Sequence, residues 1–258
     1  MKAGEAKKVA ADLNEDSMEF YSKAKRADYT NEADVYDLKR FSDFLGRFYS
    51  DLTNTILFDV LDVKEGEKVL DLATGTGRVA VGLAEKGIRI LGVDLTWKML
   101  EQARRKAVEK KLKNVYFNVA NALHLPFKSD TFDKIVSIRF FHILPFAMQK
   151  SIIQEVKRVL KPGGTFTVEF NSPFAGLFLW ALRRDHLVIW PRQVKELFQG
   201  MTVIKTVGVM LPGVGRIARI NAKAASILGR FFTFFPFNHL SNQILIVAKK
   251  EELQFQPA

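Results

Sequence analysis

The chain of 258 residues contains no cysteine and only four histidines. Without thiols it can form no disulfide, no thiolate metal site and no covalent cysteine intermediate. The histidines are scattered, with no H-x-x-x-H spacing and no carboxylates at ligand spacing. We therefore expect no metal site.

Long apolar runs are also missing. No uninterrupted stretch is long enough to span a bilayer, and the N-terminus lacks the pattern of a signal peptide. We therefore expect a cytoplasmic protein. The missing cysteine beside abundant lysine is typical of a thermophilic source, an expectation that rests on composition alone.

Acidic residues are absent from one long part of the chain. Residues 197–250 contain no Asp or Glu and seven Lys or Arg, whereas residues 1–62 hold thirteen acids and nine bases. The net charge of the whole chain is +11. The acid-free stretch fits a solvated basic face, and it equally fits contact with an anionic membrane or a nucleic acid.

The most informative stretch is a glycine turn between a predicted strand and a predicted helix. Residues 69–72 are apolar apart from Asp71, Gly75 and Gly77 follow, and residues 78–86 have helical spacing. A strand that turns through glycines into a helix presents free backbone N–H groups to a ligand. An ordinary strand–helix turn and a cofactor site both fit this pattern.

A second apolar strand follows and ends in Asp94, at the position where a carboxylate binds ribose hydroxyls in a βαβ unit. Dinucleotide enzymes have a third glycine where this chain has Ala80. Asp71 would repel a pyrophosphate but would attract a cationic ligand. These residues favour a positively charged nucleotide cofactor.

Five segments in order resemble the motifs of class I S-adenosylmethionine-dependent methyltransferases: Asp71–Gly77, Val93–Met99, Ala120–Pro126, Phe132–Ile138 and Val159–Gly164. The pattern is most similar to the ubiquinone/menaquinone C-methyltransferase-like (methyltransferase type 11) branch. This resemblance implies that S-adenosyl-L-methionine binds to Asp71, Ala73, Thr74, Gly75, Gly77, Asp94, Leu95, Met99, Asn121, Ala122, Leu123 and Arg139.

Two positions depart from the family's pattern. Ala73 replaces the first glycine of the first motif, and Asn121 replaces the acid that accepts the adenine amino group. An amide oxygen can accept the same hydrogen bond, so we expect cofactor binding to survive.

The periodicity predicts an α/β fold, a largely parallel, doubly wound sheet with helices on both faces. Strands are expected near 68–72, 89–94, 115–119, 134–139, 165–170, 202–209 and 243–248, and helices near 36–60, 78–86, 97–111, 147–160 and 191–198. The resemblance implies a Rossmann-like sheet of seven strands whose last strand is antiparallel. We divide the chain into a helical N-terminal cap (1–62), a cofactor-binding core (63–170), a C-terminal half of the core (171–250) and a tail (251–258).

Two segments of the C-terminal half are expected to cover the substrate, a loop (171–190) and an insertion before the last strand (210–240). In the insertion, Arg216, Arg219, Lys223 and Arg230 fall on one helical stripe, and Ile217, Ile220, Ile227, Leu228 and Phe231 fall on another. This amphipathic helix could act as a lid over the pocket, touch an anionic membrane, or grip nucleic acid. The predicted substrate contacts are Phe140, Phe141, Phe174, Phe178, Trp180, Trp190 and Phe231.

Methyl transfer needs a general base only where the acceptor must lose a proton. His142 is the candidate base, and its structural alternative is to cap the end of a strand. Arg139 could neutralise an oxyanion or pair with an acid. Tyr36 could close over the cofactor. The aromatic residues favour a hydrophobic small molecule or lipid-like acceptor, such as a quinone precursor. The alternatives are an RNA or protein methyltransferase that uses the basic region 205–230, and a cofactor-binding regulatory protein without turnover.

Overall fold

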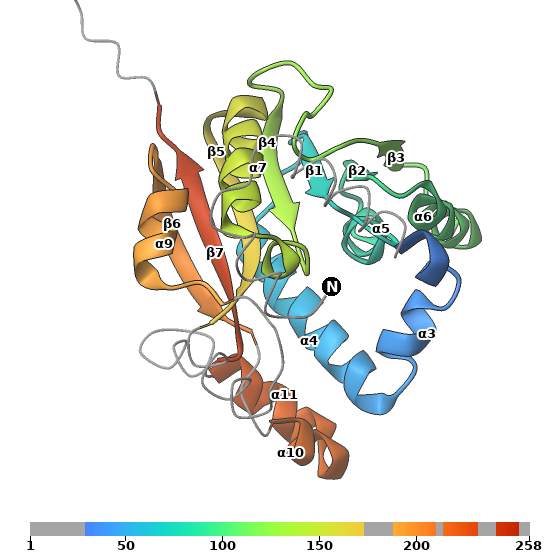
Figure 1. Ribbon diagram of the computed structural model, residues 1–258. Coiled ribbons are helices and arrows are strands. Elements are labelled where there is room, and N and C mark those ends of the chain that lie inside the picture. The colour runs from blue at the N-terminus through green and yellow to red at the C-terminus, as the bar shows by residue number, and fades with distance from the viewer. Residues whose placement is uncertain (1–28, 173–187, 210–213, 232–240, 253–258) are drawn as a thin grey trace, which may run out of the picture.

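The computed structural model describes residues 29–172, 188–209, 214–231 and 241–252 (Figure 1). The strands are β1 (Val69–Leu72), β2 (Ile90–Asp94), β3 (Val115–Val119), β4 (Phe132–Ser137), β5 (Leu160–Asn171), β6 (Met201–Gly208) and β7 (Gln243–Lys250). The helices are α3 (Tyr36–Phe41), α4 (Phe44–Leu61), α5 (Arg78–Glu85), α6 (Trp97–Glu109), α7 (Phe146–Val159), α9 (Pro191–Leu197), α10 (Val214–Ile220) and α11 (Ala222–Phe231), with a short 3-10 turn, η1 (Phe141–Ile143).

The strands form one seven-stranded sheet in the order β3-β2-β1-β4-β5-β7-β6. Strands β1 to β5 pair in parallel, and β7 runs antiparallel between β5 and β6. The predicted Rossmann-like fold with an antiparallel last strand is confirmed. Because β1 to β4 are parallel, their carboxyl ends meet at one edge of the sheet, where such folds bind ligands.

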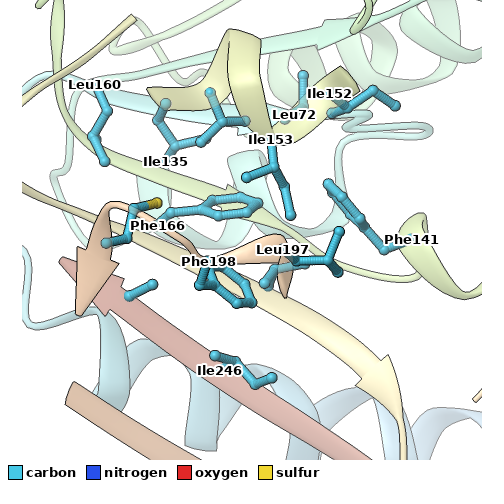
Figure 2. Packing of buried hydrophobic residues seen from close by; sticks show 14 of the residues in the cluster. Leu72, Ile135, Phe141, Ile152, Ile153, Leu160, Phe166, Leu197, Phe198 and Ile246 are labelled. Atoms are coloured by element: carbon cyan, nitrogen blue, oxygen red, sulfur yellow. The ribbon is translucent and has the colours of Figure 1, made fainter. Parts of the chain in front are cut away.

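Two hydrophobic clusters cover the two faces of the sheet. Helices α7 and α9 bury one face, where Phe166 on β5 packs between Ile153 of α7 and Phe198 after α9 (Figure 2). Helices α4, α5 and α6 bury the other face around Val69, Ile90 and Val136. All four residues of β1 are buried, as expected for a central parallel strand covered on both sides.

The helix expected over 36–60 is interrupted, which corrects that prediction. Ser42 and Asp43 separate α3 from α4, and the Asp43 carboxylate accepts a hydrogen bond from the amide of Gly46 at 2.7 Å. A side chain that accepts from the first turn starts a new helix. The break lets α3 bend away from α4 (Figure 1).

The prediction of a single amphipathic helix in the insertion is also wrong, because the structure has two helices there. Asn221 separates α10 from α11, and its side-chain oxygen accepts from the amide of Ala224 at 2.9 Å. Both helices pack on α4, through Val214, Ala218 and Ala225, which contact Phe48. Among the described residues, no helix has the length and apolar character needed to cross a bilayer.

Candidate functional site

The loop between β1 and α5 has an unusual backbone. Ala73, Gly75 and Gly77 have φ values of 59°, 56° and 77°, in the left-handed region that residues with side chains rarely adopt. Ala73 occupies such a conformation despite its methyl group. The loop therefore stores strain at Ala73 that a glycine would not carry.

The two glycines serve different purposes. A Cβ on Gly77 would lie 2.6 Å from the Cβ of Ala103, so this glycine lets α5 begin close to α6. A Cβ on Gly75 would meet no atom within 4 Å, and Gly75 lines a cavity at the carboxyl ends of β1, β2 and β4. Gly75 thus leaves space open on the cavity side, where a ligand can approach the backbone.

Asp71, on β1, fixes this loop through hydrogen bonds. One oxygen of its carboxylate accepts from the Thr74 hydroxyl at 2.5 Å and from the Ala80 amide at 3.1 Å. Burial raises the pKa of Asp71 to about 6, although these hydrogen bonds oppose the shift. Asp71 lines the cavity and also fixes the strand-to-helix turn.

Asp94 ends β2 and ties it to the same loop. Its carboxylate accepts from the amide of Gly75 at 2.9 Å and from the amide of Thr96 at 2.8 Å. Burial raises the pKa of Asp94, and the two backbone donors work against that shift. The carboxylate is thus fixed in place at the cavity wall.

The segment after β3 forms the wall next to Asp94. The Asn121 side-chain oxygen accepts from the amide of Leu123 at 3.0 Å, which shapes a tight turn. Ala122 and Leu123 line the cavity beside Leu95 and Met99. The structure therefore brings together the predicted cofactor residues at one cavity, whose wall includes Asp71, Ala73, Thr74, Gly75, Asp94, Leu95, Met99, Asn121, Ala122, Leu123 and Arg139; Gly77 lies behind it, against α6.

A second group of cavity residues comes from α3 and the end of β4. Tyr36 and Phe41 present aromatic rings, and Phe140 adds a third. The guanidinium carbons of Arg78 and Arg139 lie 5.0 and 5.4 Å from the centre of the Phe41 ring, within the range of a cation–π contact. Two cations therefore flank one aromatic ring at the cavity.

Glu169 on β5 lies within electrostatic range of these two cations. Burial raises its pKa, while the charges of Arg139 and Arg78 lower it. Among the described residues, no donor lies within hydrogen-bonding distance of one of its carboxylate oxygens. Burial and the neighbouring charge of Arg139 lower the pKa of Arg78. The sequence pattern singled out neither Arg78 nor Glu169, because each falls where helical or strand periodicity predicts an ordinary core-facing position.

Other predicted residues do not reach the cavity. The η1 turn places Phe140 and Ile143 on the wall, whereas Phe141 is completely buried against Phe166 and Phe170 in the core. His142, in the same turn, does not line the cavity either. The predicted roles of Phe141 as a substrate contact and of His142 as a base therefore stay predictions that the cavity lining does not support.

Of the predicted substrate contacts in the C-terminal half, only Trp190 has a described side chain. Trp190 is 55% exposed next to α9 and does not line the cavity. Phe174, Phe178 and Trp180 lie outside the described residues, and so does the side chain of Phe231. The described residues of α10 and α11 contact α4 and do not line the cavity, and the rest of the insertion lies outside the described residues, so its role as a lid stays a prediction. Within the described ranges, no group of three or more metal-ligating side chains occurs.

Comparison with known proteins agrees with this geometry. A family profile described as "Methyltransferase domain" matches residues 69–164. The demethylmenaquinone methyltransferase of Corynebacterium kroppenstedtii is 35% identical over 162 residues, 58% of this chain and 66% of that protein. The chain thus spans slightly less than two thirds of this relative's length.

Solved structures share the fold at lower sequence identity. A methyltransferase solved in complex with the Trm112 activator of Haloferax volcanii has a TM-score of 0.61 and 22% identity, covering 87% of this chain and 98% of that one. Geranyl diphosphate C-methyltransferase of Streptomyces coelicolor, solved with S-adenosyl-L-homocysteine, has a TM-score of 0.58 and 17% identity, covering 78% and 77%. Residues 69–164 are thus a methyltransferase domain of the class I S-adenosylmethionine-dependent kind.

Proposed function

We propose that this chain transfers a methyl group to a carbon atom of a hydrophobic ring compound that carries an acidic hydroxyl, such as a quinone precursor of the demethylmenaquinone kind. The observation that carries the proposal is the pair Arg139 and Phe41 at the cavity, a guanidinium next to an aromatic ring. The name of the Corynebacterium relative supports the same class of acceptor.

The residues at the cavity fit S-adenosyl-L-methionine. Gly75 leaves open space where a Cβ would stand, so the amino-acid part of the cofactor can approach the loop backbone. Asp94 offers its carboxylate to the ribose hydroxyls, and Asn121 offers an amide near the adenine. Asp71 contributes negative charge beneath the loop, which favours a sulfonium ion.

When bound, S-adenosylmethionine supplies a methyl group whose bond to sulfur breaks as the acceptor attacks. The protein's own work is to hold the acceptor in line and to exclude water. The rings of Tyr36, Phe41 and Phe140 provide the apolar wall for this task. Tyr36 packs edge-on against Phe41, with ring centres 6.5 Å apart, and closes that wall.

Arg139 stabilises the oxyanion of the acceptor. An ionised ring hydroxyl, which has lost its proton to solvent, donates electron density to the neighbouring ring carbon and makes that carbon a nucleophile. After this carbon gains the methyl group, it releases its own hydrogen as a proton to solvent, which restores the ring. A guanidinium close to this oxygen favours the ionised form, because charge-assisted hydrogen bonds are stronger than neutral ones. Arg139 holds the strained φ of 60° at the end of β4, a conformation typical of functional positions. His142 has no part in this proposal, since it does not line the cavity.

The test is the pair of substitutions Arg139→Gln and Arg139→Lys, assayed with a short-chain demethylmenaquinone kept in its reduced form. We expect Arg139→Gln to lower kcat by about 100-fold, the loss typical of removing one oxyanion donor. Arg139 is also one of the predicted cofactor residues, so kcat is measured at saturating S-adenosylmethionine, and the affinity for the cofactor is determined by calorimetry. Arg139→Lys should recover part of the rate, and the exposed Arg105→Gln is the matched control.

Two outcomes contradict the proposal. An Arg139→Gln variant with full activity would remove Arg139 from the chemistry. Methylation of RNA or protein but not of the quinol would favour an acceptor bound through region 205–230. The described side chains of that region do not line the cavity, which is why we place this alternative second.

A further inference from the structure

Helices α10 and α11 contact the rest of the protein through their small side chains. Val214, Ala218 and Ala225 are buried, and Phe48 and Leu228 pack against them. Leu228 thus faces α4, whereas the isoleucines of the two helices are left on the outer side. Figure 1 shows the pair beyond the edge of the sheet where β4 and β5 end, next to α4.

Three isoleucines are exposed on this outer side. Ile217 is 40% exposed, Ile220 is 90% exposed and Ile227 is 63% exposed. Ile217 and Ile220 are three residues apart on α10, so they share one face of that helix. On α4, Phe44 is also exposed and stacks on Phe48, with ring centres 6.3 Å apart, which extends apolar surface toward the same cluster.

The charge around these isoleucines has one sign. Arg219 and Lys223 are exposed, and Lys223 lies one helical turn before Ile227. Neither α10 nor α11 contains an acid, as part of the acid-free stretch 197–250. The neighbouring exposed side of α4 carries Asp43 and Asp51 together with Arg47, so the excess of positive charge is confined to α10 and α11.

We propose that the α10–α11 surface, defined by Ile217, Arg219, Ile220, Lys223 and Ile227, docks on an anionic phospholipid bilayer. Aliphatic side chains among bases match a membrane surface, where isoleucine enters the acyl boundary and the cations meet lipid phosphates. A single-stranded nucleic acid would instead require aromatic side chains for base stacking, and the described side chains of these two helices, which do not include that of Phe231, contain none. Membrane docking does not depend on the proposed methyl transfer. If the acceptor is dissolved in the membrane, docking would bring the protein to it.

The test is flotation of the full chain with vesicles of phosphatidylglycerol and phosphatidylcholine, compared with vesicles of phosphatidylcholine alone. We expect binding only to the anionic vesicles and at least tenfold weaker binding in 0.5 M salt. Ile220→Glu combined with Ile227→Glu should lower vesicle binding at least tenfold. Arg219→Gln combined with Lys223→Gln should lower it several-fold. The matched control is Val108→Glu on α6, which is 75% exposed and lies away from α10 and α11 (Figure 1).

Three results would overturn the inference. The first is an absence of vesicle binding by the unaltered chain, and the second is equal binding by the surface variants and the unaltered chain. The third is that the unaltered chain forms a dimer, that Ile220→Glu abolishes this dimer, and that neither protein binds vesicles. The α10–α11 surface would then be the interface with a second copy of the chain. Affinity for S-adenosylmethionine and the melting temperature of each variant, measured in parallel, show that the fold and the cofactor site remain intact. Failure of the docking surface would leave the proposed methyl transfer untouched.

Discussion

The Asp94 carboxylate at the end of β2 accepts a hydrogen bond from the backbone amide of Gly75, at 2.9 Å. This bond joins two segments that the sequence separates by a whole helix, α5. It fixes the glycine loop and the carboxylate relative to each other. The cavity wall is therefore organised by the protein itself, which lowers the cost of ordering these groups when a ligand binds.

Replacing Asp94 tests its role in the cofactor site. Asp94→Ala removes the ribose acceptor and also releases the amides of Gly75 and Thr96. We expect affinity for S-adenosylmethionine to fall by about 10- to 100-fold, the equivalent of about 1.5–3 kcal/mol for hydrogen bonds to a charged group. Isothermal titration calorimetry measures this change. The exposed Glu101→Gln on α6 is the control, and an Asp94→Ala affinity within twofold of the unaltered chain would refute the assignment.

Alanine substitutions at the two glycines of the loop should differ in their effects: one should mainly lower stability, and the other should mainly weaken cofactor binding. Gly77→Ala places a Cβ 2.6 Å from that of Ala103, so it should lower the free energy of unfolding by about 2–3 kcal/mol. Gly75→Ala meets no atom and should cost only about 1 kcal/mol of backbone strain, yet its methyl group enters the cavity and should weaken cofactor binding strongly.

Urea denaturation and calorimetry on both variants separate these two effects. The second substitution Ala103→Gly should restore stability to Gly77→Ala in part, because it removes the clashing Cβ. It should leave Gly75→Ala unimproved. Equal losses of cofactor affinity in both glycine variants would argue against a direct approach of the ligand at Gly75.

Ala73→Gly should stabilise the protein. The left-handed backbone costs alanine about 1–2 kcal/mol, and the larger entropy of an unfolded glycine offsets about half of that. We expect a net gain of about 0.5–1 kcal/mol in the free energy of unfolding. The control Ala84→Gly, at a buried position within helix α5, should lower stability by about 1 kcal/mol or more. A loss of stability in Ala73→Gly would show that Ala73 carries no strain.

Asp71 should give the stability a distinct dependence on pH. Its pKa of about 6 in the folded chain exceeds the ordinary value of 3.8, so the folded chain keeps a proton that the unfolded chain has released. The contribution of Asp71 to stability is full below about pH 4 and declines as the pH rises to about 6. The decline amounts to about 3 kcal/mol.

The measurement is the free energy of unfolding of the unaltered chain and of Asp71→Asn between pH 4 and pH 7. Burial also raises the pKa values of Asp94 and Glu169, but both proteins share these groups. The difference between the two curves therefore reports Asp71. A flat difference curve would mean that Asp71 is ionised across this range in the folded chain.

Local patterns predicted the core of the fold well. The strand at Val69–Leu72, the glycine turn and Asp94 follow from apolar periodicity and from the chemistry of a strand–turn–helix unit. The same reasoning failed at Asp43 and Asn221, where a capping side chain divides one periodic segment into two helices. A cap and a residue within a helix look alike to a pattern that counts only apolar spacing.

Tertiary packing decides the features that the sequence did not reveal. The helical stripe of isoleucines in the insertion did not reveal which side chains face the protein; Ala218 and Ala225 form the buried face because α10 and α11 pack on α4. The charges of Arg78 and Arg139 act on Glu169 only because the fold brings the start of α5 and the end of β4 within electrostatic range of this residue on β5. No local spacing encodes such a meeting.

The central claim is methyl transfer to a reduced quinone, and mass spectrometry of the acceptor tests it most directly. The chain is incubated with S-adenosylmethionine that carries a deuterated methyl group and with a short-chain demethylmenaquinone kept reduced. We predict an acceptor that gains one labelled methyl on a ring carbon, with an equal amount of S-adenosylhomocysteine. An unlabelled acceptor, in a sample where calorimetry shows that the cofactor binds, would contradict the account.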